Sequence, residues 1–438
     1  MRTDRTAIRK RGGRASRVAR ARLKIVKIPI SIGYSVIAVI LTPMSASAHV
    51  KWFVNCNAAD DPIPPMEVFT KTFFLFFSVF LVVLYIGCVF ERTALGANIS
   101  QVLDRITATL HRRSDDLLRS VAAVSFALLW ADGRLILTPE LKASSMWLSA
   151  IHLLVPIYMF WRATLPAAGV GIIVLYGQGI ASYGLFHMLD YPVFIGLGVF
   201  FMLSVSENER LQAFRFDFLR WTLAASLFWP AMEKFVYPGW VAPIAITHPE
   251  ITLGFDVTTV VTAAGVVEAG LSFALFWTPL VRRAAALVFI LLLTAATFDF
   301  GKVDGIGHMM IITIFLVVLA NPAGTPERCR PILAPLVGCI AVPAVIFLYT
   351  GGHALYYGSK NASAGPFMIG AAMLALIFLS LNALPRTGRR RPSAVNAQRG
   401  QRLREAPRVS SASAETSRAG VARGRGDRAR GGIGRPAF

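Results

Sequence analysis

The sequence has few charged residues and few cysteines. Charged side chains make up 16% of the 438 residues and hydrophobic ones 55%, whereas soluble globular proteins carry about 25% charged residues. The apolar residues occur in runs long enough to cross a lipid bilayer. These proportions exclude a soluble enzyme and a disordered chain, and four cysteines in so long a chain exclude a disulfide scaffold.

Several catalytic and metal-binding motifs are also missing. The sequence has no Cys-x-x-Cys pair, which excludes a dithiol redox centre and an iron–sulfur site. It has no Gly-x-Ser-x-Gly or Rossmann glycine pattern, and Gly301-Lys302 lacks the upstream glycine of a phosphate-binding loop. Its seven histidines form no His-x-His, His-x-x-x-His or His-Glu-x-x-His motif, so no metal site is preorganised by sequence spacing.

The excess positive charge lies in two terminal segments. Residues 1–28 hold 11 Lys/Arg and one Asp, and residues 386–438 hold 14 Arg and three acids. The 357 residues between them hold 20 residues of each sign. Such tails orient membrane proteins or contact anionic lipid. We therefore expect both tails to bind anionic lipid headgroups, and we expect no binding of nucleic acid.

The N-terminus has the pattern of a secretory signal. A basic region ends at Lys27, an apolar stretch covers 28–44, and Ala46-Ser47-Ala48 is a small-x-small cleavage signature. We assign 1–48 to the basic N-terminus and signal peptide, and 49–66 to a periplasmic segment. Because the basic region is long, an uncleaved signal anchor is the alternative. Cleavage would leave His49 as the new N-terminus, whose amino group and ring could chelate copper.

Apolar run lengths predict an all-α, polytopic membrane helix bundle with about eleven spans. The predicted spans are 67–90, 119–137, 146–161, 165–184, 192–205, 217–236, 257–278, 281–299, 305–320, 331–350 and 365–384. Region 67–118 holds the first span and an amphipathic helix, in which Ile99, Leu103, Ile106 and Leu110 share one face. Region 322–385 holds the last two spans, and the Arg-rich tail 386–438 is predicted to be disordered.

The arginines of the predicted loops favour one orientation. When residues 1–28 are placed in the cytoplasm, every loop arginine except Arg134 falls on the cytoplasmic side. This orientation predicts a multi-pass protein of the bacterial inner membrane with a cytoplasmic C-terminus.

Two stretches of the sequence look alike, which indicates an internal duplication. The matching segments are Leu117–Arg119, Phe160–Trp161 and Phe186–Asp190 in the first copy, and Phe218–Arg220, Phe276–Trp277 and Phe300–Asp304 in the second. They predict two parallel four-helix units, 119–216 and 217–321, and membrane proteins often place a site between such repeats. Chance similarity between apolar sequences is the alternative.

The second copy also resembles a known family. The pattern is carried by Arg220, Phe228, Lys234, Glu268, an Arg-Ala-Ala turn at 283–285 and Gly307-His308. Over about 217–321 it is similar to the DoxX-like integral membrane proteins, and the copy at 117–205 is similar more weakly, with Arg134 and His152 near the positions of Lys234 and Glu268. The best-known members of the family resemble the small subunit of thiosulfate:quinone oxidoreductase. The resemblance implies a four-helix unit and is compatible with quinone chemistry.

Ionisable residues inside membrane spans are rare and tend to face a cavity. Those of this chain form a candidate polar core, namely His152, Asp190, Arg220, Lys234, Glu268, Asp304 and His308. We predict that Lys234 lies within ion-pair reach of Glu268 or Glu233, and that His152 faces the bundle. Glu268 either locks the four-helix unit in a buried pair, or transfers protons or hydrogen-bonds a quinone. The His and acid residues predicted on the outer face could share a metal site, and the alternative is that they are scattered loop and interface residues.

Two classes of function remain open. The first is a quinone-linked redox protein, or an accessory subunit with a redox partner subunit, whose site lies on the periplasmic side. The second is a non-enzymatic membrane protein that handles copper or a solute on that side.

Overall fold

The computed structural model describes residues 60–133, 135–247, 249–322, 330–358 and 364–383. Within these ranges the chain is helical and contains no β-strand, which confirms the predicted all-α class. The predicted signal peptide, His49 and the tail 386–438 lie outside the described residues.

Every segment predicted as a span coincides with a helix. The helices are α2 (Pro65–Val68), α3 (Lys71–Phe90), α4 (Ala94–Arg112), α5 (Ser114–Ala131), α6 (Met146–Tyr158), α7 (Leu165–Tyr183), α8 (Leu185–Met188), α9 (Val193–Leu203), α10 (Glu209–Val236), α11 (Pro238–Thr247), α12 (Val257–Ala274), α13 (Pro279–Phe300), α14 (Lys302–Ala320), α15 (Leu333–Tyr357) and α16 (Ala364–Ala383). Short 3₁₀ turns cover Arg162–Thr164 and Pro249–Thr252.

Fewer of these helices than predicted meet the criteria for a membrane span. Six in the described chain are long and apolar enough, namely α3, α7 with its preceding 3₁₀ turn, α12, α13, α14 and α15. The apolar helices α6 and α9 have 13 and 11 residues, and a bilayer requires about 20. In α5 charged residues occupy the first turns, and in α10 they occur at both ends and in the middle of the helix. The described residues are therefore compatible with a multi-pass membrane bundle with six candidate spans, and the predicted number of eleven is not confirmed.

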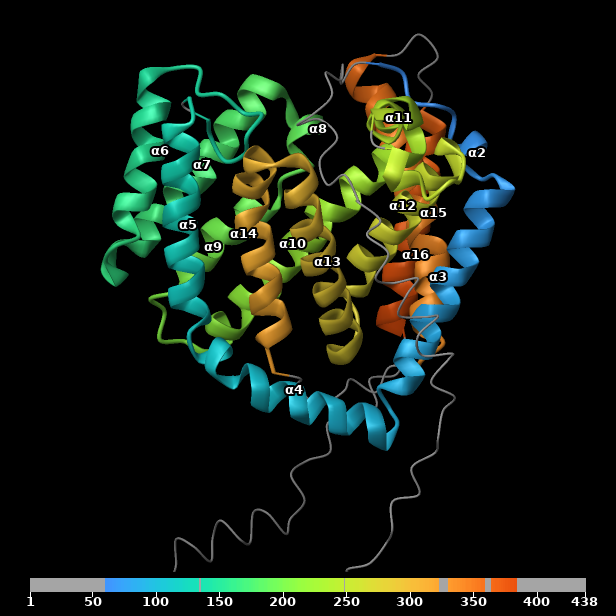
Figure 1. Ribbon diagram of the computed structural model, residues 1–438, viewed down its shortest axis with the longest axis horizontal. Coiled ribbons are helices and arrows are strands. Elements are labelled where there is room, and N and C mark those ends of the chain that lie inside the picture. Colours follow the sequence, from blue (N-terminus) through green and yellow to red (C-terminus); the bar gives the residue numbers. More distant parts are fainter. Residues whose placement is uncertain (1–59, 134, 248, 323–329, 359–363, 384–438) are drawn as a thin grey trace, which may run out of the picture. The chain divides into compact units, whose positions relative to one another are not determined.

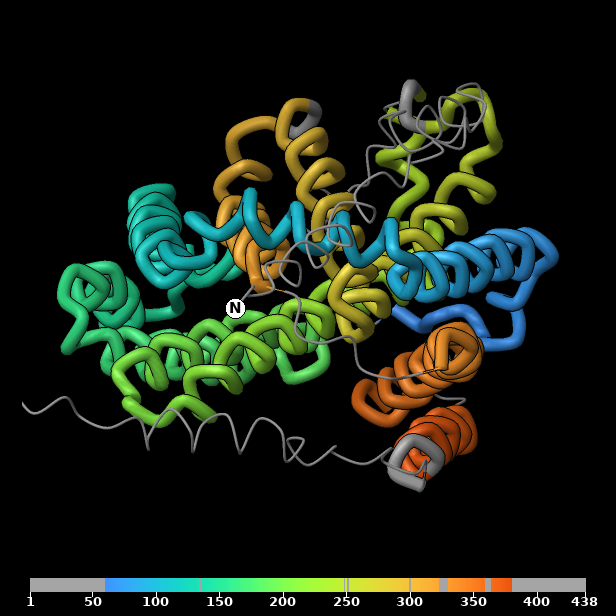
Figure 2. The backbone as a smooth tube through the Cα atoms, turned by 90° about the horizontal axis from the view of Figure 1, so that it is seen from below, coloured from blue at the N-terminus to red at the C-terminus, as the bar shows by residue number. Residues whose placement is uncertain are grey.

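Helix α4 runs across one end of the bundle, which we call the α4 end; α8 and α11 lie at the opposite end (Figure 1; Figure 2 views the molecule from the α4 end). The predicted apolar face is divided, because Ile99 and Ile106 are exposed while Leu103 is half-buried. Leu95 and Val102 join Ile99 and Ile106 in an exposed apolar stripe at helical spacing. One face of α4 thus packs on the bundle and another is free to lie in the membrane interface.

The helices of the two predicted four-helix units pack reciprocally. Helix α9, the last of the first set, packs along α10, and α14, the last of the second set, packs along α5. The first helix of each set also carries the same local ion pair, Asp116–Arg119 at 3.2 Å and Asp217–Arg220 at 2.9 Å. The last helix of each set therefore contacts the first helix of the other.

Small residues allow the closest helix contacts. An added Cβ at Gly169 of α7 would lie 2.4 Å from the Gly198 carbonyl oxygen of α9. The same close approach joins α15 to α16, because a Cβ at Gly351 would lie 2.2 Å from the Phe367 amide nitrogen. Such contacts bring helix backbones together in membranes, where packing replaces the hydrophobic effect. Helix α3 completes this side by packing on α12 and α15.

Candidate functional site: a buried polar cluster

The polar cluster is centred on an ion pair between α10 and α12. The last turns of α10 are buried throughout, because α12 and α15 cover them. There Lys234 Nζ donates a hydrogen bond of 2.7 Å to Glu268 Oε2, with only 2% of the Lys234 side chain exposed. This contact confirms the predicted pairing. The other carboxylate oxygen of Glu268, Oε1, has no hydrogen-bond partner among the described residues.

A second acid–base pair lies on α14. Asp304 and His308 are one turn apart, and His308 Nδ1 lies 2.8 Å from Asp304 Oδ2. Both side chains are fully buried, and Thr297 of α13 contacts the same Asp304 oxygen at 3.4 Å. His308 also interacts electrostatically with Glu268. The two pairs are thus within electrostatic range of each other, although no hydrogen bond between them is seen among the described residues.

Two further acids connect the cluster to neighbouring helices. Tyr349 of α15 donates a hydrogen bond of 3.1 Å to Glu233 Oε1, and Asp190 interacts electrostatically with Tyr349. Asp190 interacts in the same way with Tyr176 of α7. The contacts among these groups are therefore the pairs Lys234–Glu268, Asp304–His308 and Tyr349–Glu233. Asp190 is within electrostatic range of Tyr349 and Tyr176.

Sequence reasoning placed Arg220 in this polar core, and the structure corrects that placement. Arg220 precedes Lys234 by 14 residues on the same helix, which separates them by about 21 Å along its axis. Its Nη1 donates to the Leu275 carbonyl at 2.7 Å and its Nη2 to Asp217 at 2.9 Å. Arg220 therefore belongs to the α4 end, and it does not neutralise Glu268.

His152 is buried but separate from the cluster. Its exposure is 0%, and its ring meets Phe126 edge-on at 5.3 Å, so the prediction that it faces the bundle is confirmed. Neither ring nitrogen forms a hydrogen bond with the described residues. The polar group that influences the ring is the backbone of Leu135. No described contact joins His152 to Glu268 or to the other predicted core residues.

Tyr349 is the member of the cluster that sequence reasoning missed. It lies in a long apolar helix and carries no charge, so a search for ionisable residues passes over it. Its hydroxyl is hydrogen-bonded to Glu233. The centroid of its ring lies 4.7 Å from that of Trp229 and 4.9 Å from that of Phe186, so that the three aromatic rings pack together beside Glu233. A tyrosine in the middle of an apolar span is the signal that could have identified it, because a buried hydroxyl requires a polar partner.

The arrangement suits proton movement better than metal binding. The Asp304 carboxylate and the His308 imidazole lie 2.8 Å apart away from water, where a proton can be shared between them. Among the described residues, no three His, Cys, Asp or Glu side chains come together as a metal site. His49, the predicted copper ligand, lies outside those residues.

Comparisons with known protein families, characterised proteins and solved structures find no match to this chain. The DoxX-like resemblance therefore rests on the motif residues alone.

Proposed function

We propose that this chain is a multi-pass inner-membrane protein of DoxX-like type that binds a quinone at the polar cluster. In this role it acts as a quinone-linked redox protein or as the accessory subunit of one. The observation that carries the proposal is the burial of two acid–base pairs, Lys234–Glu268 and Asp304–His308, within apolar helices of the same bundle. Reduction of a quinone takes up two protons with two electrons, and these residues are able to supply protons. The electrons would come from a redox partner subunit.

The unsatisfied carboxylate oxygen of Glu268 supports a functional role over a structural lock. A charged group inside a membrane costs a few kcal/mol and is kept where function requires it. A lock that only joined α10 to α12 would be expected to satisfy both oxygens, because an unpaired buried polar atom costs about 1–3 kcal/mol. Glu268 Oε1 remains available to a ligand or a water molecule.

Extraction of bound quinone tests this proposal. We expect the full chain, purified from native membranes, to retain close to one quinone per molecule, measured by solvent extraction and chromatography. Glu268→Gln should lower that content at least tenfold. The exposed Glu209 lies at the opposite end of α10, so that Glu209→Gln serves as the matched control and should retain the quinone. Wild-type protein without quinone, unable to take it up from quinone-loaded nanodiscs, would contradict the proposal.

The same preparation discriminates the second class of function. Copper handling would give bound copper in elemental analysis and no quinone. Handling of another solute would give neither. N-terminal sequencing adds an independent reading, because a copper site at His49 requires a mature chain that begins His49-Val50-Lys51.

We also propose the cytoplasmic C-terminus and the internal duplication. Reciprocal packing of α9 on α10 and α14 on α5, together with the shared Asp–Arg pair of α5 and α10, supports the duplication. Reporter fusions test the orientation. Those after Arg92, Arg283 and Arg391 should read cytoplasmic, and those near Lys142 and Asn361 periplasmic. A periplasmic reading after Arg391 would overturn it.

A further inference from the structure

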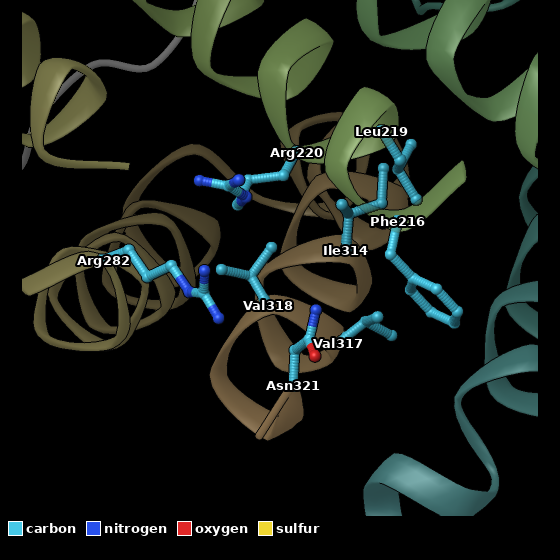
Figure 3. A pocket seen from close by; sticks show the side chains of 8 residues that line it. All are labelled: Phe216, Leu219, Arg220, Arg282, Ile314, Val317, Val318 and Asn321. Carbon is cyan, nitrogen blue, oxygen red and sulfur yellow. The ribbon is translucent and has the colours of Figure 1, made fainter. Parts of the chain in front are cut away.

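A second polar site lies at the α4 end of the bundle, far from the polar cluster. It is a pocket between α10, α13 and α14, and its polar lining consists of Arg220, Arg282 and Asn321 (Figure 3). The rest of the lining is apolar, and no carboxylate belongs to it. Two guanidinium groups thus reach one pocket from different helices, and Asp217, the acid paired with Arg220, is not part of its lining.

The charge of Arg282 is not balanced by any close partner. Arg282 makes no hydrogen bond or ion pair with the described residues, although its Nε is buried. Among charged groups, Arg220 acts on it most strongly, and this interaction is repulsive. Asp217 and Glu91 act on it more weakly, and Asp217 is already paired with Arg220.

Both arginines that act on Arg282, namely Arg220 and Arg283, form an ion pair with an aspartate. Arg283, the other cation that acts on Arg282, pairs with Asp104 at 2.6 Å. Arg220 is 7% exposed, and its Nε is buried with no hydrogen-bond partner among the described residues. Two like charges that face one pocket repel each other, and an anion that binds there offsets this repulsion. The pocket lining itself holds no carboxylate that could do so.

The pocket also lies at the depth where lipid headgroups are found. Arg282 is in the first turn of α13, and Asn321 directly follows α14, so both stand where candidate spans end. The exposed apolar stripe on α4, formed by Leu95, Ile99, Val102 and Ile106, marks the same end as a membrane interface. Basic pockets between helix ends on such a face suit phosphate headgroups.

We infer that this pocket binds a phosphate group through Arg282, with Arg220 Nε and the Asn321 amide as further donors. The enclosed space is about 10 Å³, which is room for one water-sized group. One phosphate oxygen enters the pocket, and the remainder of the group stays at the mouth. Arginine suits this task because its planar fork of donors matches phosphate oxygens. The phosphate belongs either to an anionic lipid or to a soluble ion.

Thermal unfolding of the purified full chain tests the inference. The protein is measured in nanodiscs of phosphatidylcholine, in nanodiscs containing phosphatidylglycerol, and in phosphatidylcholine nanodiscs with added inorganic phosphate. We expect phosphatidylglycerol to raise the Tm of the wild type and Arg282→Gln to abolish that rise. The matched control is Arg210→Gln, which removes an exposed arginine from α10 and should keep the rise. Phospholipid titrations should show at least tenfold weaker binding to Arg282→Gln only.

The Tm in phosphatidylcholine nanodiscs alone shows whether the Arg282→Gln variant is folded as stably as the wild type. Because Arg282 is repelled by Arg220 and has no partner, Arg282→Gln should unfold at the same Tm as the wild type or at a higher one. A lower Tm would show that Arg282 forms a structural pair and would overturn the inference. The inference also fails if neither lipid nor phosphate raises the wild-type Tm, or if the rise survives in Arg282→Gln. A rise with inorganic phosphate identifies a soluble ion, and a rise with phosphatidylglycerol only identifies a lipid headgroup.

Discussion

The pair of Lys234 and Glu268 makes a prediction whose size follows from the structure. At a separation of 2.7 Å, the Coulomb attraction is about 6 kcal/mol for an effective dielectric constant of 20. Much of it offsets the removal of two charges from water, so that the pair itself is close to neutral for stability. Removal of one partner leaves the other charge buried, which costs about 3–5 kcal/mol.

A double-mutant cycle measures this coupling. We expect Lys234→Met and Glu268→Gln each to lower the free energy of unfolding by about 2–5 kcal/mol, and the double variant by much less than their sum. Lys234→Met should lower the free energy of unfolding more than Glu268→Gln does, because it removes the cation that offsets the repulsion between Glu268 and Glu233. Unfolding in mixed micelles with increasing dodecyl sulfate gives the free energies.

The control pair lies on the surface. Lys302 and Asp132 are 3.4 Å apart, with 74% and 39% of their side chains exposed. Exposed pairs contribute about 0.2–1 kcal/mol, so a cycle of Lys302→Met and Asp132→Asn should show little coupling. If the Lys234–Glu268 cycle is additive within about 0.5 kcal/mol, the reasoning from burial is refuted, and Glu268 carries no paired charge in the membrane.

Three further predictions test other parts of the fold. Gly351→Ala should destabilise the protein because its Cβ would clash with the backbone of α16, whereas Gly177→Ala, which meets no atom within 4 Å, should not; thermal unfolding compares them. Asp104→Asn should release α4 from the buried Arg283, and faster tryptic cleavage within α4 would report it. The hydrogen bond that Asp256 accepts from Thr259 lowers the pKa of Asp256; this cap is therefore intact above the usual aspartate range and is lost as the pH falls through the lowered value. Asp256→Asn should remove that part of the acid dependence of stability, and an unchanged acid profile would contradict the capping role.

The positions of the helices could be predicted from the sequence, but not which of them span a bilayer. Apolar runs predicted the helices from α3 to α16 apart from α4, which followed from amphipathic spacing, and the short α8 and α11, which were not predicted. Burial in lipid and burial in a protein core require the same residues. Run length does not distinguish the short apolar helices α6 and α9 from spans; α9 is mostly buried among other helices, whereas α6 exposes Met146, Trp147 and Leu154.

The candidate site was predicted in part for a similar reason. Lys234 and Glu268 are conspicuous in apolar sequence, and a buried charge requires an opposite one, so their pairing followed from chemistry. Arg220 was misplaced because a sequence shows that a residue is charged but not at which end of a 28-residue helix its partner lies. Tyr349 was missed because a neutral hydroxyl gives no charge signal.

The reciprocal packing of α9 on α10 and of α14 on α5 has a consequence for biogenesis. Helix α5 leaves the ribosome early, but the surface that covers it belongs to α14, which is made only after most of the chain has been synthesised. During that interval α5 presents an uncovered flank to the membrane. The first four-helix set, α5, α6, α7 and α9, is therefore incomplete when it is made, and its closure depends on a contact between distant parts of the chain. A chain truncated after α13 should accordingly be inserted into the membrane but be degraded faster than the full-length protein.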